Sequence, residues 1–347
     1  MDRDFLIGRE ELNLRYAMPA GERALSFEHT GGDFAAWRDR CKPKLADLLG
    51  FQDPSAAAVT ELRRTTHESV EVRALVMAVA GNLSIPAYLL TPPEIADPAA
   101  AVMAIHGHNT DAAAMCLGLA GGGYNQFALA LAQAGRRVLL PVHRGFGVLR
   151  DLAHGRADRR LEYEASMHFS YVTDAFLRGR TVVGENVEDL LRWEHWLAET
   201  LSVERVHAAG LSYGGDLALV YPLFSRRVAT IFASGSCASM EAHFDRCYNG
   251  PAHCIPGILK WMDRADVAGM NAPRPLLLHF GQHDTPCLQP GRENYAAAYN
   301  EYADDLIRQA EAIYAAAGAA GKVRLVVTEG MGHAMDVPAL KAFLEAN

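Results

Sequence analysis

A pentapeptide in the second half of the chain has the residue types that nucleophilic catalysis requires. Gly210-Leu211-Ser212-Tyr213-Gly214 fits the pattern G-x-S-x-G, and a further glycine follows it. Glycines on both sides of the serine allow a sharp turn between a strand and a helix, which leaves the serine hydroxyl exposed above a sheet. An apolar strand-like segment precedes the motif and an apolar helix-like segment follows it. This context favours a nucleophile elbow over a simple glycine-rich turn and predicts Ser212 as the nucleophile.

A serine hydroxyl is a weak nucleophile near neutral pH, so a base and an orienting acid must accompany it. Asp284 follows the apolar segment 276–279, and His333 follows the last strand-like segment of the chain. Both residues are therefore expected at carboxyl ends of strands, where the side chains of a parallel sheet converge. The chain order serine, acid, histidine is the one that accompanies a G-x-S-x-G elbow. We predict a triad of Ser212, Asp284 and His333.

Attack of a serine on a carbonyl also needs two backbone N–H groups that stabilise the developing oxyanion. Tyr213, the residue after the nucleophile, is predicted to supply one of them. The loop His106-Gly107-His108-Asn109 follows an early apolar strand, and the N–H of His108 is predicted as the second donor. The same loop leaves open a metal site built from His106, His108 and Asp111, although an H-x-H pair is weak evidence for one.

Further side chains are candidates for contact with a substrate, namely His106, Tyr248 and Trp261. Tyr248 and Trp261 fall in the irregular segment 235–272, and loops of this length are usually either functional or disordered. We expect this segment to form a short cap over the site, the alternative being a long connection. Three other histidines are interpreted as structural residues: His143, His243 and His253.

The elements that must position these residues alternate along the chain from about residue 70. Strands are expected at 70–79, 83–90, 101–106, 137–142, 205–211, 228–233, 275–280 and 322–328, and helices at 126–134, 164–178, 188–201, 215–224, 294–317 and 338–346. Short apolar strands that alternate with helices imply a mostly parallel central sheet with helices on both faces. The first two strands, separated by Ala80-Gly81-Asn82, are typical of an antiparallel hairpin. The sequence therefore predicts an α/β fold.

The first 66 residues differ from the rest, because they contain charged helical patterns and no clear strand. A helix is expected from Asp33 to Leu49, broken at Pro43 and closed by Gly50. We predict an N-terminal helical extension over residues 1–66 and a catalytic domain over residues 67–347, with a cap-like insertion at about 235–272.

Composition excludes several classes of protein. The 347 residues include 33 Lys and Arg against 41 Asp and Glu, and this balance supplies no basic stripe for nucleic acid. Half of the residues are hydrophobic, which is enough for a large core, yet no apolar run is long enough to span a membrane. The first residues lack the features of a secretory signal, so a cytoplasmic location is expected. The six cysteines form no CxxC pair, which argues against a zinc ribbon or a disulfide framework.

Together these residues resemble the α/β-hydrolase superfamily over about residues 68–347. The elbow, the strand-end acid, the Gly332-His333 pair and the His106-Gly107 loop match its motifs. The chain looks most like the dienelactone hydrolase-like and acetyl-xylan-esterase-like branch, with which it shares Arg144-Gly145-Phe146-Gly147, Arg180-Thr181-Val182-Val183-Gly184, Cys254-Ile255-Pro256-Gly257, Ala272-Pro273-Arg274-Pro275-Leu276, Trp37-Arg38 and Lys44-Leu45-Ala46-Asp47-Leu48-Leu49-Gly50. Two departures are Ser212, where dienelactone hydrolases have a cysteine, and His108, where related acetyl esterases often have an aromatic residue.

The resemblance implies an α/β-hydrolase fold and a serine hydrolase that cleaves small-molecule carboxylic esters, with a short acyl group such as acetyl, through an acyl-enzyme. This mechanism needs no metal ion and no organic cofactor. A C–C bond or lactone hydrolase would use the same triad, and a non-catalytic ligand-binding protein of the same fold is a further alternative. A peptidase is a weaker alternative, because 66 residues cannot supply the propeller domain of prolyl-oligopeptidase-like enzymes. Homodimers are common in this fold, and the sequence leaves the oligomeric state open.

Overall fold

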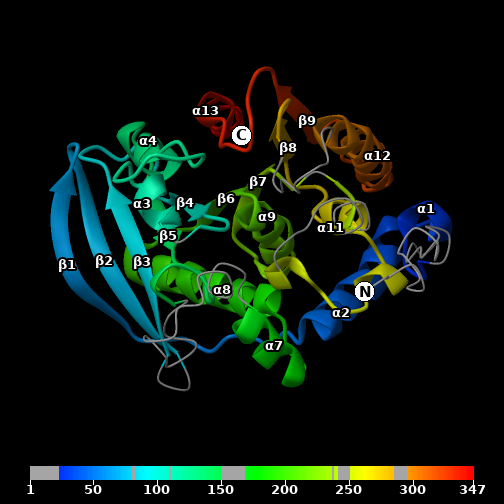
Figure 1. Ribbon diagram of the computed structural model, residues 1–347, viewed down its shortest axis with the longest axis horizontal. Helices are drawn as coiled ribbons and strands as arrows, with labels where there is room; N and C mark the ends of the chain where they lie inside the picture. Colours follow the sequence, from blue (N-terminus) through cyan, green and yellow to red (C-terminus); the bar gives the residue numbers. More distant parts are fainter. Residues whose placement is uncertain are drawn as a thin grey trace, which may run out of the picture.

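The computed structural model describes residues 23–79, 83–109, 111–149, 169–236, 238–240, 251–284 and 295–347. Through these residues runs a nine-stranded sheet in the order β1-β2-β3-β5-β4-β6-β7-β8-β9 (Figure 1). The strands are β1 Val59–His67, β2 Val70–Val79, β3 Leu83–Thr91, β4 Ala100–Ile105, β5 Val138–Pro141, β6 Arg205–Leu211, β7 Val228–Ser234, β8 Leu276–Gly281 and β9 Val323–Thr328. Strands β4 to β9 pair in parallel, whereas β1, β2 and β3 join the sheet by antiparallel pairing. The predicted mostly parallel sheet with an antiparallel edge hairpin is confirmed, and the turn of that hairpin lies outside the described residues.

The central strands are apolar on both faces because consecutive side chains of a strand point to opposite sides of the sheet. In β4, Met103 and Ile105 belong to the core on one face, whereas Val102 and Ala104 belong to the core on the other. Strands that are buried on both faces appear in the sequence as short continuous apolar runs. This is why the central strands could be found from sequence alone.

Helices cover both faces of the sheet (Figure 1). The larger layer contributes to the core that contains Met103 and consists of α2 Phe34–Leu49, α7 Phe169–Leu177, α8 Val182–Leu201, α9 Tyr213–Phe224, α11 Arg264–Gly269 and α12 Tyr295–Ala316. The smaller layer consists of α3 Ala112–Cys116, α4 Phe127–Gln133 and α13 Val337–Glu345. Within the described ranges, the remaining short helices are α1 Phe27–Thr30 and the 3₁₀ turns η4 Pro251–His253 and η5 Ile258–Lys260.

Helix α2 runs without interruption through Pro43, so the expected break at this residue was wrong. The helix buries four side chains at a spacing of four residues, Trp37, Cys41, Leu45 and Leu49. This stripe packs into the main core and outweighs the loss of one backbone hydrogen bond at the proline. The helix ends at Gly50, which has the left-handed conformation of a C-terminal cap.

Strand β1 contradicts the expectation that residues 1–66 contain no strand. It pairs with β2 from Val59 to His67 at the edge of the sheet, and most of its side chains are exposed. An edge strand of this kind has no buried face, so it lacks the alternation of apolar and polar residues that reveals a half-buried strand. The sheet thus begins within the segment expected to be a helical extension, and the division into two parts remains a prediction.

The expected cap at 235–272 is only partly described, because residues 237 and 241–250 lie outside the described residues. Every residue from 262 to 272 is buried, and α11 packs against both α9 and α12. This part of the segment therefore belongs to the core of the domain rather than to a covering loop.

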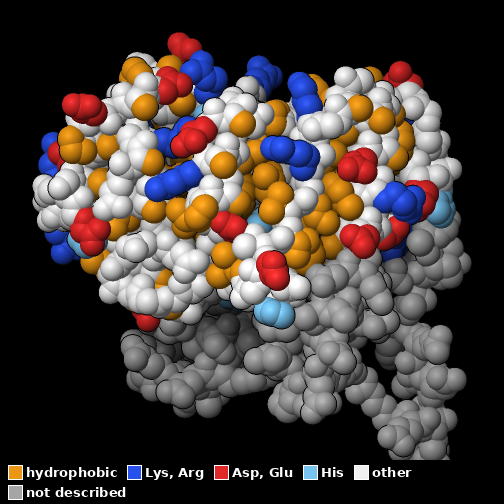
Figure 2. Space-filling model, turned by 90° about the horizontal axis from the view of Figure 1, so that it is seen from above, with side chains coloured by type: hydrophobic (Ala, Val, Ile, Leu, Met, Phe, Trp, Pro, Cys, Tyr) orange, Lys and Arg blue, Asp and Glu red, His pale blue; other side chains and the backbone are white. Residues whose placement is uncertain are grey.

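The described part of the surface in Figure 2 carries acidic and basic side chains mixed among apolar ones, without a basic stripe. In the described residues, no helix combines the length and the apolar character needed to cross a membrane.

Candidate active site

Ser212 lies at the turn between β6 and α9, as the G-x-S-x-G pattern predicted. Its backbone has φ 63° and ψ −126°, a strained combination that residues other than glycine rarely adopt. The turn requires the glycines of the motif: a Cβ at Gly210 would lie 2.0 Å from the carbonyl oxygen of Gly214, and a Cβ at Gly214 would lie 2.0 Å from that of Ile105. The Ser212 N–H donates to Ser234 O at 2.8 Å, which ties the strained residue to the neighbouring strand.

His333 and Asp284 form a hydrogen-bonded pair at the carboxyl ends of β8 and β9. His333 Nδ1 lies 2.8 Å from Asp284 Oδ1. The Asp284 side chain is 1% exposed, whereas that of His333 is 27% exposed. The His283 N–H donates to Met331 O at 2.8 Å and thereby joins the two loops that carry the pair. The imidazole is therefore anchored at one nitrogen and accessible enough to act at the other.

The imidazole of His333 lies beside the elbow. A Cβ built on Gly235 would lie 2.8 Å from His333 Cε1 and 3.3 Å from Leu211 Cδ1. Because Gly235 has no side chain, the His333 ring can lie in this space, next to Leu211. The backbone after the histidine is also held in place, because the Met335 N–H donates to Gly123 O at 2.7 Å.

The loop after β4 packs directly on the elbow. A Cβ on Gly107 would lie 2.5 Å from Leu211 O and 2.7 Å from Ser212 Cβ, so only glycine fits there. Tyr124 fixes this loop, because its hydroxyl accepts from the Gly107 N–H at 2.9 Å and donates to His108 O at 2.8 Å. No sequence pattern indicates this role of Tyr124, because the role depends on a contact between segments that are distant along the chain.

His106 is placed differently from what the expectation of a substrate contact requires. Its side chain is buried, Nδ1 lies 2.9 Å from Gly107 O, and the ring lies 4.3 Å from that of His143. Burial lowers the pKa of His106 to about 4 and that of His143 well below its ordinary value. Two neutral rings therefore pack beneath the loop, and the geometry supports a structural role for His106 rather than contact with substrate.

The two other expected substrate contacts are Tyr248 and Trp261. Tyr248 lies outside the described residues. The ring of Trp261 lies 4.4 Å from Lys44 Nζ of α2, and Trp261 O accepts from the Leu25 N–H at 2.7 Å. The described contacts of Trp261 thus join it to the N-terminal segment.

Tyr213 is held by α8 and by the loop after β5. Its ring stacks on that of Phe146, with 4.9 Å between centroids, and its hydroxyl accepts from Asn186 Nδ2 at 2.9 Å. Asn186 Oδ1 in turn accepts from the Arg144 N–H at 2.8 Å. The side chain of Tyr213 is therefore held in place by helix α8 and by the loop after β5.

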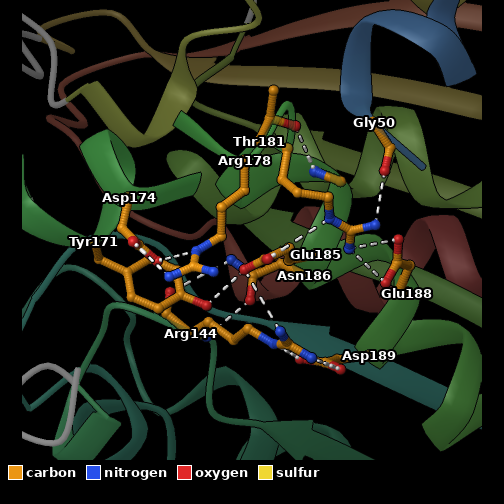
Figure 3. Close-up of polar contacts among 12 residues, drawn as sticks. Gly50, Arg144, Tyr171, Asp174, Arg178, Thr181, Glu185, Asn186, Glu188 and Asp189 are labelled. Carbon is orange, nitrogen blue, oxygen red and sulfur yellow. Dashed lines mark hydrogen bonds and ion pairs between the residues drawn. The ribbon is translucent and has the colours of Figure 1, made fainter. Parts of the chain in front are cut away.

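A network in which half-buried arginines pair with buried carboxylates supports this arrangement (Figure 3). Arg144 contacts Asp189 through two hydrogen bonds of 2.6 and 2.9 Å, and Arg180 joins Gly50 O to Glu188. Burial alone would lower the pKa of Arg144, but the charge and hydrogen bonds of Asp189 outweigh it and raise the pKa. The loop after β5, helix α8 and the end of α2 are thus joined near the elbow.

The predicted oxyanion residue His108 has ring contacts that sequence reasoning missed. Its Nδ1 lies 3.3 Å from Nε2 of His253, and His253 Nδ1 forms a short hydrogen bond with Asp216 Oδ2. The alternative of a metal site at His106, His108 and Asp111 finds no grouping of this kind: within the described ranges, no cluster of three or more His, Cys, Asp or Glu side chains could hold a metal ion.

A hollow of about 580 Å³ lies beside the amino ends of β4 and β6, at the end of the strands opposite to Ser212. Arg136, Arg205 and His207 are among the residues that line it. Ligands of open α/β sheets bind at the carboxyl ends of the strands, where Ser212, Asp284 and His333 converge, and the hollow is not part of this site.

The comparisons with known proteins concern the fold. No protein-family model matches the sequence, and no curated protein is significantly similar to it. The structure is similar to that of a candidate acetyl xylan esterase from Bacteroides fragilis NCTC 9343, with a TM-score of 0.71 and 15% identity over 90% of this chain and 87% of the other. It is also similar to a glucuronoyl esterase from Solibacter usitatus, with a TM-score of 0.61 and 12% identity over 97% and 98% of the two chains.

A third similar structure is acetyl xylan esterase 1 from Thermoanaerobacterium sp. JW/SL YS485, with a TM-score of 0.53 and 17% identity over 89% of this chain and 93% of the other. At identities this low, the structural similarity establishes the fold alone, and the activity has to be argued from the site. The predicted α/β-hydrolase fold is confirmed.

Proposed function

We propose that this protein is a serine esterase that cleaves carboxylic esters through an acyl-enzyme. Ser212 is the nucleophile, His333 the general base and acid, and Asp284 the residue that orients the imidazole. The backbone N–H groups of Tyr213 and His108 bind the oxyanion.

The observation that carries this proposal is the hydrogen bond of 2.8 Å between His333 Nδ1 and the buried Asp284, beside a strained serine. Asp284 is acceptor-only when ionised, so its contact with Nδ1 leaves Nε2 of a neutral imidazole unprotonated. A base of this form can take the proton of a serine hydroxyl. Strain at Ser212 adds support, since backbone strain of this kind is concentrated at functional sites.

The proposed reaction proceeds in two halves. Ser212 Oγ attacks the ester carbonyl while His333 Nε2 takes its proton, and the negative charge that forms on the carbonyl oxygen is bound by the two N–H groups. His333 then gives the proton to the leaving alkoxide, and the acyl group remains on Ser212. A water molecule deprotonated by His333 attacks the acyl-enzyme and releases the acid, which restores the free serine.

We infer a preference for short acyl groups such as acetyl. Two of the similar structures are named for acetyl xylan esterase activity.

The experiment that tests the proposal is the initial rate of hydrolysis of p-nitrophenyl acetate, butyrate and octanoate, with Ser212→Ala as the matched control. The expected result is turnover that is fastest with acetate and lost in the variant. A fluorophosphonate probe should label the wild-type protein at Ser212 and fail to label the variant.

Absence of turnover combined with labelling of Ser212 would replace the esterase by a hydrolase of narrow specificity, such as one that acts on a lactone or a C–C bond. Absence of both turnover and labelling would contradict the triad itself.

A further inference from the structure

A line of polar side chains runs from the predicted oxyanion loop into the core, separate from the triad. It begins at His108, continues through His253 of η4 and Asp216 of α9, and ends at Arg264 of α11. Each of the last three side chains is at least nine-tenths buried. Burying an imidazole, a carboxylate and a guanidinium in one row costs free energy unless each group forms hydrogen bonds with the next, so the arrangement calls for an explanation.

The polarity of the row follows from the hydrogen-bonding capacity of its members. Arg264 donates to Asp216 Oδ1 from Nε and Nη2, at 3.0 Å each, so the carboxylate is ionised and accepts. Asp216 Oδ2 then accepts from His253 Nδ1. In the neutral ring, His253 Nε2 is left as an acceptor, and it faces Nδ1 of His108 at 3.3 Å. With His253 in this form, His108 Nδ1 is the donor of the contact.

The row of side chains is connected to the elbow through Asp216. Asp216 lies in the first turn of α9, and its N–H donates to Ser212 O at 3.2 Å. A shift of Asp216 relative to Ser212 is thus opposed by the helix, and the position of the carboxylate is passed on to His253.

His253 contacts both residues that are proposed to bind the oxyanion. Its ring stacks on that of His108, with 4.9 Å between centroids and 18° between planes, and it meets the ring of Tyr213 edge-on at 5.1 Å. Phe146 closes the other side of the two proposed donors, 5.1 Å from His108 and 4.9 Å from Tyr213. One imidazole is thus in contact with the side chains of both donors.

We propose that His253 is a positioning residue for the oxyanion hole: held by Asp216 and Arg264, it fixes the ring of His108 and thereby the direction of the His108 N–H. This inference rests on the proposed function, in which that N–H binds the oxyanion. Its consequence is that the loss of His253 affects the transition state more than substrate binding, because the oxyanion exists only after attack.

A pair of substitutions separates positioning from simple packing. In His253→Gln, the side-chain oxygen reaches the place of Nε2 and can still accept from His108, whereas in His253→Asn the amide reaches only as far as Nδ1 and keeps the bond to Asp216 alone. His207→Asn is the matched control, because His207 is also 6% exposed and bonded at Nδ1, yet it lies near the amino end of β6, away from Ser212.

The expected result on p-nitrophenyl acetate is a fall in kcat of roughly ten- to hundredfold for His253→Asn, with KM changed by less than about threefold. His253→Gln should recover most of that loss, and His207→Asn should keep the wild-type kcat. The rate of labelling by a fluorophosphonate should follow kcat, because the phosphonyl oxygen occupies the same hole.

Wild-type kcat in His253→Asn would overturn the inference while leaving the esterase intact. Equal losses in both His253 variants, in step with their melting temperatures, would also overturn it, since packing alone would then explain them. If the wild-type protein neither turns over the ester nor reacts with the probe, the proposed function is contradicted, and the inference about His253 is contradicted with it.

Discussion

Gly107 and Ser212 approach each other so closely that a methyl group at residue 107 would lie 2.7 Å from Ser212 Cβ. The same methyl group would lie 2.5 Å from Leu211 O, and this backbone atom cannot rotate away. The loop after β4 and the elbow after β6 are thus in direct contact at the point where the two proposed oxyanion donors must converge.

Gly107→Ala is therefore expected to displace the oxyanion loop from the elbow. A displacement of about 1 Å can lower a rate about a hundredfold, and we expect a loss of at least this size in kcat on p-nitrophenyl acetate. Gly121→Ala is the control, because a Cβ at residue 121 meets nothing within 4 Å. Wild-type kcat in Gly107→Ala would show that the contact is irrelevant to turnover.

Asp284→Asn tests the role of the acid without changing its shape. An asparagine offers either an N–H or a carbonyl oxygen to His333 Nδ1, so it no longer enforces the tautomer that leaves Nε2 free to accept a proton. We expect kcat to fall roughly 10³- to 10⁴-fold. Asp336→Asn serves as a control carboxylate: Asp336 caps α13, and because asparagine caps a helix about as well as aspartate, both the melting temperature and kcat should stay nearly unchanged. Comparable kcat losses in both variants would argue against a specific role for Asp284.

Tyr124→Phe tests the hydroxyl that joins Gly107 N to His108 O. Its loss leaves a buried N–H without its partner and is expected to lower the free energy of unfolding by about 1–3 kcal/mol, measured by urea denaturation. Because the same hydroxyl holds the oxyanion loop, kcat should also fall, by roughly tenfold. Tyr314→Phe removes another hydroxyl bonded to a backbone carbonyl, far from the loop, and should change stability alone. Equal kcat values in the two variants would contradict the role assigned to Tyr124.

The parts of the site that could be predicted are those that local sequence patterns determine. Ser212, Asp284 and His333 each follow a short apolar strand, and the carboxyl ends of parallel strands meet at one edge of a sheet. The glycines around Ser212 further marked the turn. The structure places all three residues at the ends of the expected strands.

The parts that could not be predicted depend on contacts between distant segments. Asp216 and His253 are separated by 37 positions in sequence, and neither belongs to a motif. Edge strand β1 and the continuity of helix α2 through Pro43 were missed for a related reason. An exposed strand has no apolar alternation, and the burial that stabilises a helix around Pro43 is decided by the elements packed on it.

Buried neutral histidines are expected to make the protein less stable as the pH falls from about 6.5 to 4. Burial lowers the pKa of His207 to about 4, with contributions from Arg136 and Arg205. Over this range the unfolded chain binds a proton at His207 that the folded protein does not, so the free energy of unfolding decreases by up to about 1.4 kcal/mol per pH unit for this residue. Above about pH 6.5 both states are neutral at this ring, and the contribution is constant.

His207→Asn removes this titration and should flatten the decrease between pH 6.5 and 4, measured by urea unfolding at several pH values. The variant and the wild-type protein should differ by a constant amount above pH 6.5 and converge below it, because only the wild-type protein loses stability to protonation at this position. Parallel curves throughout the range would show that His207 is protonated equally in the folded and unfolded states, and thus that its burial does not shift its pKa.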